Sequence, residues 1–173
     1  MNEMVQYEKA LQKFYNSCNI NTLPLISWDF YGPYFDMLRS YCEDIVALQQ
    51  LAQRNNWSYD SEFDTALFEK NQVIVITDAK LKIVHSTDNI VTMNGYRPQE
   101  ILGKNPKVFQ GPKTCEATKK RIRLAINKKV GFEETVLNYR KDGSTYNCWI
   151  KGEPIFNAEG EFVNFIAYEK KVA

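Results

Sequence analysis

The sequence predicts an α+β fold, in which a helical N-terminal part precedes a sheet that is interrupted by helices. Three observations support this. The β-branched run Val73–Thr77 is typical of a buried strand. Residues 114–129 place apolar side chains at helical spacing between many basic ones. Asp142-Gly143 lies between two strand-like runs and is a strong hairpin signal.

Composition narrows the function classes. The 173 residues carry 22 Lys+Arg against 21 Asp+Glu, a net charge of +1, so nothing indicates the concentrated basic surface of a nucleic-acid-binding protein. No apolar run approaches the ~20 residues of a membrane helix, and the N-terminus has no signal-peptide pattern. The four cysteines are scattered singly beside one histidine, so spacing predicts free thiols rather than a metal site. We therefore expect a cytoplasmic protein without membrane or nucleic-acid partners.

Residues 1–67 are expected to form an N-terminal helical extension, and residues 68–173 a separate domain. Met1–Cys18 has helical spacing and is followed by a break. A second helix is expected from about Pro33, with proline in its first turn, to about Arg54. A short helix over Ser61–Glu69 leads into the domain. The second helix carries an apolar stripe made by Phe35, Leu38, Cys42, Ile45, Leu48 and Ala52. It either packs on its own domain or serves as a dimerisation or signalling helix. Acidic residues dominate the chain up to Lys70 and basic ones the rest, which favours docking of the two parts on each other.

The domain begins with two strands and ends with three. The expected strands are Val73–Thr77, Lys82–Ser86, Phe132–Tyr139, Thr145–Ile155 and Glu161–Glu169. Short helices are expected between Thr87 and Leu102. A longer helix is expected to begin at Thr114 or Cys115, of which Thr114 is a good N-cap, and to end at Gly131. The two-residue period puts Tyr146, Cys148 and Ile150 on one face of their strand.

This order, together with specific residues, resembles the PAS fold, a five-stranded antiparallel sheet with helices on one face. Asn94-Gly95-Tyr96 followed by Glu100–Lys104 is similar to the PAS signature GY…E(I/L)LGK, and Tyr139–Ser144 is similar to its sheet hairpin. The match covers about Phe68–Lys171. The run 23–29, with Asn55-Asn56-Trp57 later, resembles the leader of small stand-alone bacterial PAS proteins.

Within PAS, Gly103–Pro112 is similar to the motif GxNCRFLQGP of light-oxygen-voltage (LOV) photoreceptors, in which the cysteine bonds to a flavin under blue light. Here Pro106 stands at the cysteine position. Cys115 lies on a different element and is a poor substitute. The resemblance implies no covalent photochemistry, but it leaves non-covalent flavin binding open as one option, beside an unknown ligand or none.

The candidate binding residues follow from the same resemblance. Flavin-contacting positions of the LOV family match at Asn105, Gln110 and Asn138. Two positions depart: Cys148 stands where asparagine is expected, and Glu169 where glutamine is expected. Residue type favours Cys148 as a small core residue that could also touch a ligand. Because an ion is costly to bury and Lys170-Lys171 adjoin, we expect Glu169 at a solvated pocket edge. Ile150 completes the candidate set from its pocket-facing strand position.

No catalytic function is expected. The chain has neither a G-x-x-x-x-G-K-[ST] phosphate loop nor a G-x-S-x-G nucleophile elbow, and His85 is expected to be a packed or half-exposed strand residue. The PAS resemblance implies a sensory module that binds a small ligand or a protein and signals to a partner in trans. A homodimer through the N-terminal helices or the sheet is expected. The alternatives are a ligand-free interaction domain and a flavin protein without the adduct.

Overall fold

The described part of the chain opens with a long helix, α2 (Leu25–Arg54). The computed structural model describes residues 25–59 and 63–172, so the helix expected over residues 1–18 lies outside the described residues. The chain divides into two units between Arg39 and Ser40, and α2 crosses this boundary. The expected start at Pro33 is wrong, since α2 already begins at Leu25. A proline removes one backbone hydrogen bond, and a long helix can continue past it.

The second unit is built on one five-stranded antiparallel sheet, which confirms the predicted fold class. Its order, β2-β1-β5-β4-β3, places the C-terminal strand β5 in the centre and the edges at β2 and β3. The strands are β1 (Val73–Asp78), β2 (Ile83–Ser86), β3 (Phe132–Tyr139), β4 (Thr145–Phe156) and β5 (Phe162–Val172). The predicted hairpin joins β3 to β4, where Gly143 has φ 85° and the Asp142 carboxylate accepts from the Ser144 amide at 2.8 Å.

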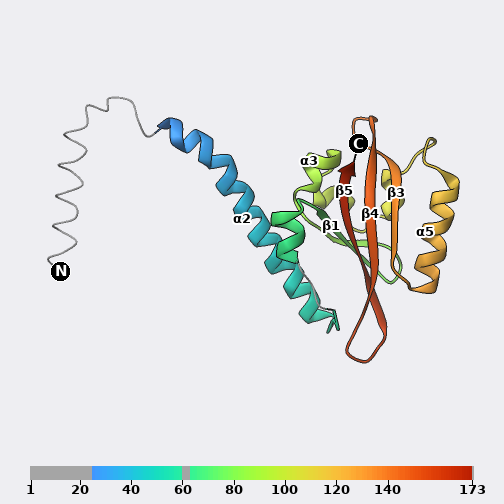
Figure 1. Ribbon diagram of the computed structural model, residues 1–173. Helices are drawn as coiled ribbons and strands as arrows, with labels where there is room; N and C mark the ends of the chain where they lie inside the picture. The colour runs from blue at the N-terminus through green and yellow to red at the C-terminus, as the bar shows by residue number, and fades with distance from the viewer. Residues whose placement is uncertain (1–24, 60–62, 173) are drawn as a thin grey trace, which may run out of the picture. The chain divides into compact units, whose positions relative to one another are not determined.

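Helices enter the fold between α2 and β1 and between β2 and β3, as Figure 1 shows. They are η1 (Thr65–Glu69), α3 (Ile90–Asn94), α4 (Pro98–Ile101), the 3₁₀ turn η2 (Pro106–Phe109) and α5 (Glu116–Lys128). The left-handed Gly95 ends α3, and α5 packs beside β3. Of the two expected starts of α5, the structure uses Cys115 as the N-cap, without a side-chain capping bond, and Thr114 does not cap the helix. In the described residues no helix is both long and apolar enough to span a bilayer.

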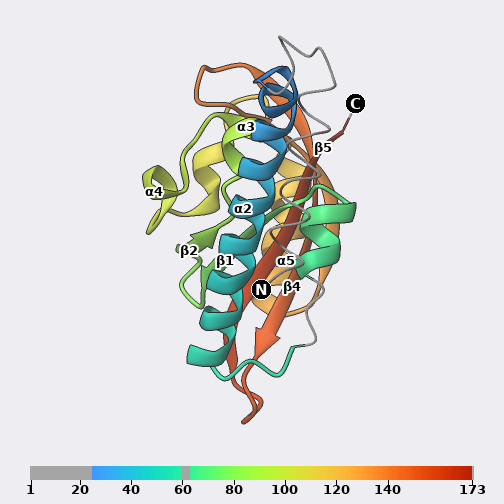
Figure 2. The ribbon, with the colours of Figure 1, turned by 90° about the vertical axis from the view of Figure 1, so that its left-hand side faces the viewer.

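Strand side chains alternate between two faces, and each face has its own core. On the face that we call outer, Ile74, Ile76 and Ile166 pack with Tyr41 and Leu48 from α2. Phe63 and Leu67, which precede β1, join the same cluster. Figure 2 looks onto this side of the sheet. The C-terminal half of α2 is therefore part of the domain core.

On the opposite, inner face, side chains of β1 and β4 pack with residues from the short helices. Val75 and Cys148 come from the sheet, Ile90 and Ile101 from α3 and α4, and Phe109 from η2. The two clusters use neighbouring residues of the same strands, so the sheet separates them by one backbone layer.

Asp44, on α2, is a buried carboxyl that accepts a hydrogen bond from the backbone amide of Asp88 at 3.0 Å. Burial raises its pKa to about 7, the Asp88 amide bond opposes that rise, and the charges of Asp88 and Glu43 add to it. The pKa of Asp44 in the folded state lies above the ordinary value of 3.8, so ionising this buried carboxyl destabilises the fold. This destabilisation is absent at low pH, grows as the pH rises from about 4 to 7, and is complete above about pH 7.

We expect Asp44→Asn to raise the free energy of unfolding at pH 8 by about 1–3 kcal/mol and to change it little at pH 4. The amide keeps the acceptor for Asp88 and removes the ionisable group. Urea unfolding at both pH values measures the effect, with the exposed Asp64→Asn as control. An equal gain at pH 4 and pH 8 would contradict the buried-carboxyl explanation.

Candidate functional site

A cavity of about 180 Å³ lies between the inner face of the sheet and the segment formed by η2 and α5. Strands β1, β3, β4 and β5 supply its floor, and η2 and α5 supply its other walls. Most of its lining is apolar, contributed by Val75, Phe109, Ile122, Ile126, Phe132, Ile150, Phe165 and Ala167. Gly152 also lines it, and a side chain there would meet the Phe132 ring at 2.4 Å, so glycine keeps this part of the floor open.

The structure brings five of the six candidate binding residues to this one cavity. Asn105, Gln110, Asn138, Ile150 and Glu169 all belong to its lining, although they come from η2's flanks, β3, β4 and β5. Cys148 is fully buried but is not one of the lining residues. Ligand contact by any of them remains a prediction.

Asn105 and Pro106 together start the η2 turn. Asn105 is its N-cap, and its side-chain oxygen accepts from the Lys107 amide at 3.0 Å. This bond uses the acceptor of Asn105 and leaves its amide nitrogen as the group that can serve a ligand. Pro106 fills the first position of the turn, where a missing N–H costs nothing. It lines the cavity without a nucleophilic atom.

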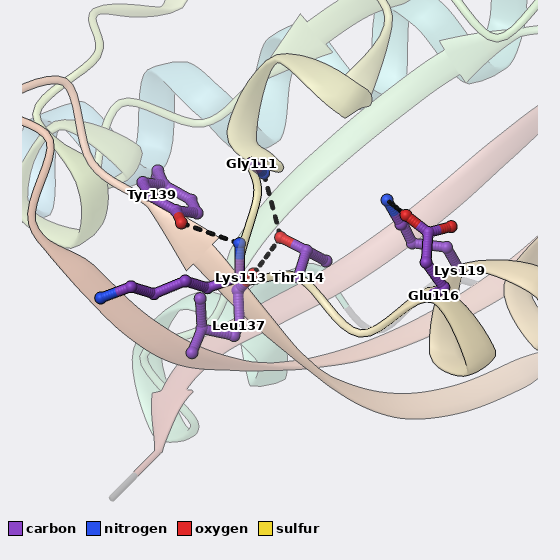
Figure 3. A network of polar contacts seen from close by, with 7 residues as sticks. All are labelled: Gly111, Lys113, Thr114, Glu116, Lys119, Leu137 and Tyr139. Atoms are coloured by element: carbon purple, nitrogen blue, oxygen red, sulfur yellow. Dashed lines mark hydrogen bonds and ion pairs between the residues drawn. The ribbon is translucent and has the colours of Figure 1, made fainter.

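The loop between η2 and α5 is fastened to β3 by side-chain hydrogen bonds (Figure 3). The Thr114 hydroxyl accepts from the Gly111 amide at 3.0 Å and donates to the Leu137 carbonyl at 2.7 Å. The Tyr139 hydroxyl accepts from the Lys113 amide at 3.0 Å. A Cβ at position 111 would come within 2.5 Å of the Tyr139 ring, so the loop approaches β3 closely only with glycine there. This network fixes the cavity's closing segment.

We expect Thr114→Val to lower the free energy of unfolding by about 1–2 kcal/mol, because the isosteric side chain leaves a half-buried carbonyl and a half-buried amide without their partner. Hydrogen exchange should quicken at the Gly111 amide. The control is Thr135→Val on the exposed side of β3. Unchanged exchange at Gly111 would show that the hydroxyl does not anchor the loop.

Three basic side chains line the cavity as well: Lys107, Lys119 and Arg123. Lys119 forms an ion pair with Glu116 on the same helix. Among the described residues, Lys107 and Arg123 have no ion-pair partner, so they offer positive charge to an anionic group. Arg121 points elsewhere and holds α5 to β3 through both carboxylate oxygens of Glu134, at 2.5 and 2.8 Å.

Glu169 is the most buried ionisable group of the cavity, with 4% of its surface exposed. Its carboxylate oxygen Oε2 accepts from the Cys148 thiol at 3.6 Å. Burial raises the pKa of Glu169 to about 7, and the thiol's hydrogen bond opposes that rise. Burial and the neighbouring carboxyl also raise the pKa of Cys148, so this thiol stays protonated and is a poor nucleophile.

The expectation of a solvated pocket edge for Glu169 is therefore wrong. Glu169 lies opposite Val73 on β1 and Ile150 on β4, in the central strand of the sheet, and both neighbours shield it from solvent. His85 is half-buried on edge strand β2, as expected, and its Nε2 atom has no hydrogen-bond partner among the described residues. Burial lowers its pKa.

The basic lining residues are not predicted from the sequence. A signal for them exists: Lys119, Ile122, Arg123 and Ile126 follow the i, i+3, i+4, i+7 spacing of one helix face. Because Ile122 and Ile126 face the cavity, their helical neighbours face it too. Gly152 gives no signal, since its role depends on the Phe132 ring from the paired strand.

Comparison with known proteins identifies the family of this domain and several relatives. The model of the PAS domain family matches residues 71–170, and the chain belongs to that family. The chain is 33% identical to phototropin-2 of Oryza sativa over 115 residues and 35% identical to Protein TWIN LOV 1 of Arabidopsis thaliana over 112 residues. It is 32% identical to a blue-light photoreceptor of Listeria monocytogenes over 102 residues. These matches span 65%, 62% and 57% of the chain but only 13%, 28% and 40% of the relatives.

The solved structures that resemble this domain include LOV domains, as the sequence relatives do. The dark structure of the Aureochrome1 LOV photoreceptor is similar with a TM-score of 0.60 and 34% identity, over 67% of this chain and 86% of that one. A structure described as "Flavin Analogue Sheds Light on Light-Oxygen-Voltage Domain Mechanism" has a TM-score of 0.60 and 31% identity, over 66% and 87% of the two chains. The domain is thus a PAS domain whose relatives and structural neighbours include LOV domains of sensory proteins.

Proposed function

We propose that this chain is a sensory module whose PAS cavity binds a small planar ligand by non-covalent contacts and passes the bound state to a partner protein. The observation that carries the proposal is the cavity itself. It combines apolar walls, amide side chains and cationic side chains between the sheet and the anchored η2–α5 segment. Such a concave, mostly apolar site with a few polar groups is the usual form of a small-molecule site.

The lining defines the chemistry of the ligand. Phe109, Ile150 and Ala167 favour a flat apolar ring system, while Gln110 and Asn138 can donate to and accept from its polar edge. Lys107 and Arg123 favour an anionic group at another point of the ligand. A flavin nucleotide combines all three features, and the LOV neighbours support it as the first ligand to test. Bound there, a flavin would supply visible absorption and redox chemistry.

We expect a bound flavin to show no light-induced covalent adduct. Pro106 has no thiol, and Cys148 is fully buried outside the cavity lining, where burial raises the pKa of its thiol. Blue illumination of the flavin-loaded protein should therefore leave the visible flavin bands without a reversible bleach. A bleach that recovers in the dark and disappears in Cys148→Ala would contradict this.

The alternating side chains of β5 connect the cavity with the outer face, which offers a route for passing on the ligand-bound state. Ala167 faces the cavity, and its neighbour Ile166 lies in the outer core with Leu48 of α2. A ligand that binds one packing of the inner face better shifts the outer core and α2 toward the matching arrangement. We propose α2 and the outer face as the route to the partner, which includes a second copy of this chain.

Titration with riboflavin and with its phosphate, followed by flavin fluorescence, tests the proposal. We expect saturable binding of both, with the phosphate form tighter at low salt because of Lys107 and Arg123. Absence of binding by either would remove flavin. If no other small molecule is found in the purified protein, a ligand-free interaction domain becomes the better explanation.

A further inference from the structure

Glu169 is unusual among the polar groups of the cavity because it is ionisable and has one weak partner. Of the described residues, only Cys148 donates to its carboxyl group, through a sulfur that lies 3.6 Å from Oε2. A buried carboxylate ordinarily needs a cation or several hydrogen bonds, because losing water costs several kcal/mol or more. Glu169 has neither, so its neutral, protonated form is favoured.

We infer that Glu169 carries a proton in the cavity and donates a hydrogen bond to the ligand, which presents an acceptor such as a carbonyl oxygen or an unprotonated ring nitrogen. The inference rests on the proposed function and specifies the ligand's chemistry. Oε2 is already engaged by the thiol, so the hydroxyl at Oε1 is the group left to serve the ligand.

The surroundings of Glu169 support a neutral acid. From β4 it is faced by the thiol of Cys148 and the phenol of Tyr146, and burial raises the pKa of both. From β1 it pairs with Val73, which has no charge. The cationic groups of the cavity, Lys107, Lys119 and Arg123, lie on η2 and α5, and the described residues contain no ion pair between them and Glu169. Burial raises the pKa of Glu169 to about 7, against the opposing thiol bond.

Proton donation makes ligand binding depend on pH. Below about pH 7 the free protein already carries the proton on Glu169, so binding involves no proton exchange. Above it, most free protein is ionised, and each binding event takes up one proton from solvent. No covalent bond between protein and ligand forms or breaks. The affinity should therefore fall by up to about tenfold per pH unit above that point.

Riboflavin is a suitable probe, because it has no phosphate whose own ionisation would overlap this range. We expect its Kd to be constant from pH 5.5 to 6.5 and to rise steeply above about pH 7 in the native protein. Glu169→Gln, whose amide donates at every pH, should bind with little pH dependence. The exposed Glu159→Gln is the matched control and should follow the native profile. Cys148→Ala should move the midpoint to higher pH, since its thiol bond lowers the pKa of Glu169.

An affinity that is independent of pH in the native protein, or that increases with pH, would overturn the inference. If riboflavin binds to no variant, flavin as the ligand fails, and infrared spectroscopy of the unliganded protein then decides the proton assignment. A carboxylic-acid carbonyl band that Glu169→Gln removes, and that persists to about pH 7, supports it. Loss of that band near the ordinary glutamate value of 4.5 overturns it.

Discussion

Replacing Leu48 with alanine is expected to lower the free energy of unfolding by about 2–5 kcal/mol. Leu48 lies on α2, is fully buried, and packs with Ile74, Ile76 and Ile166 on the outer face of the sheet. Truncation removes apolar contact and leaves a cavity between helix and sheet, and the rigid strands limit how far the site can collapse. Urea unfolding measures the loss.

The matched control for this change is Val46→Ala, on the same helix but half exposed. It should cost less than about 1 kcal/mol, since it removes little buried surface. If the two substitutions have the same small effect, the C-terminal half of α2 does not cover the outer face, and the proposed route from cavity to partner fails with it.

Ala167→Phe is expected to abolish riboflavin binding while the domain stays folded. Ala167 lies in the cavity floor on β5, opposite Val75 and Gly152, where an aromatic ring would occupy the space that the ligand needs. Filling a cavity offsets part of the usual cost of overpacking, about 1–3 kcal/mol. Fluorescence titration and thermal unfolding together separate loss of binding from loss of folding.

The same residue change can be made outside the cavity at Ala158, in the exposed turn between β4 and β5. Ala158→Phe should bind riboflavin as the native chain does. Binding that survives Ala167→Phe with unchanged affinity would place the ligand elsewhere on the protein.

The strands were predictable because local chemistry determines them. The β-branched run at Val73–Thr77 forms a strand wherever it is buried, and Asp142-Gly143 encodes its own turn. The site was predictable through Asn105, Gln110 and Asn138 only as positions in a motif. That they line one cavity depends on how β3 and η2 meet in three dimensions.

What escaped prediction depends on distant partners. The two-residue period predicts which face of the sheet Glu169 lies on, but not how deeply it is buried. Its burial comes from β1 and β4, which pair with β5 on either side. Thr114 is a residue type that often caps helices, yet its hydroxyl donates to the backbone carbonyl of Leu137 on β3. Pro33 suggests a helix start, whereas α2 continues through it from Leu25.

Native mass spectrometry of the gently purified protein tests the claim of a ligand-holding cavity most directly. We expect the native chain and Ala158→Phe, after incubation with riboflavin, to carry one additional non-covalent mass that Ala167→Phe lacks. A ligand site between the sheet and the η2–α5 segment would be contradicted if all three proteins carried the same additional mass. It would also be contradicted if none of them carried riboflavin or any co-purified small molecule.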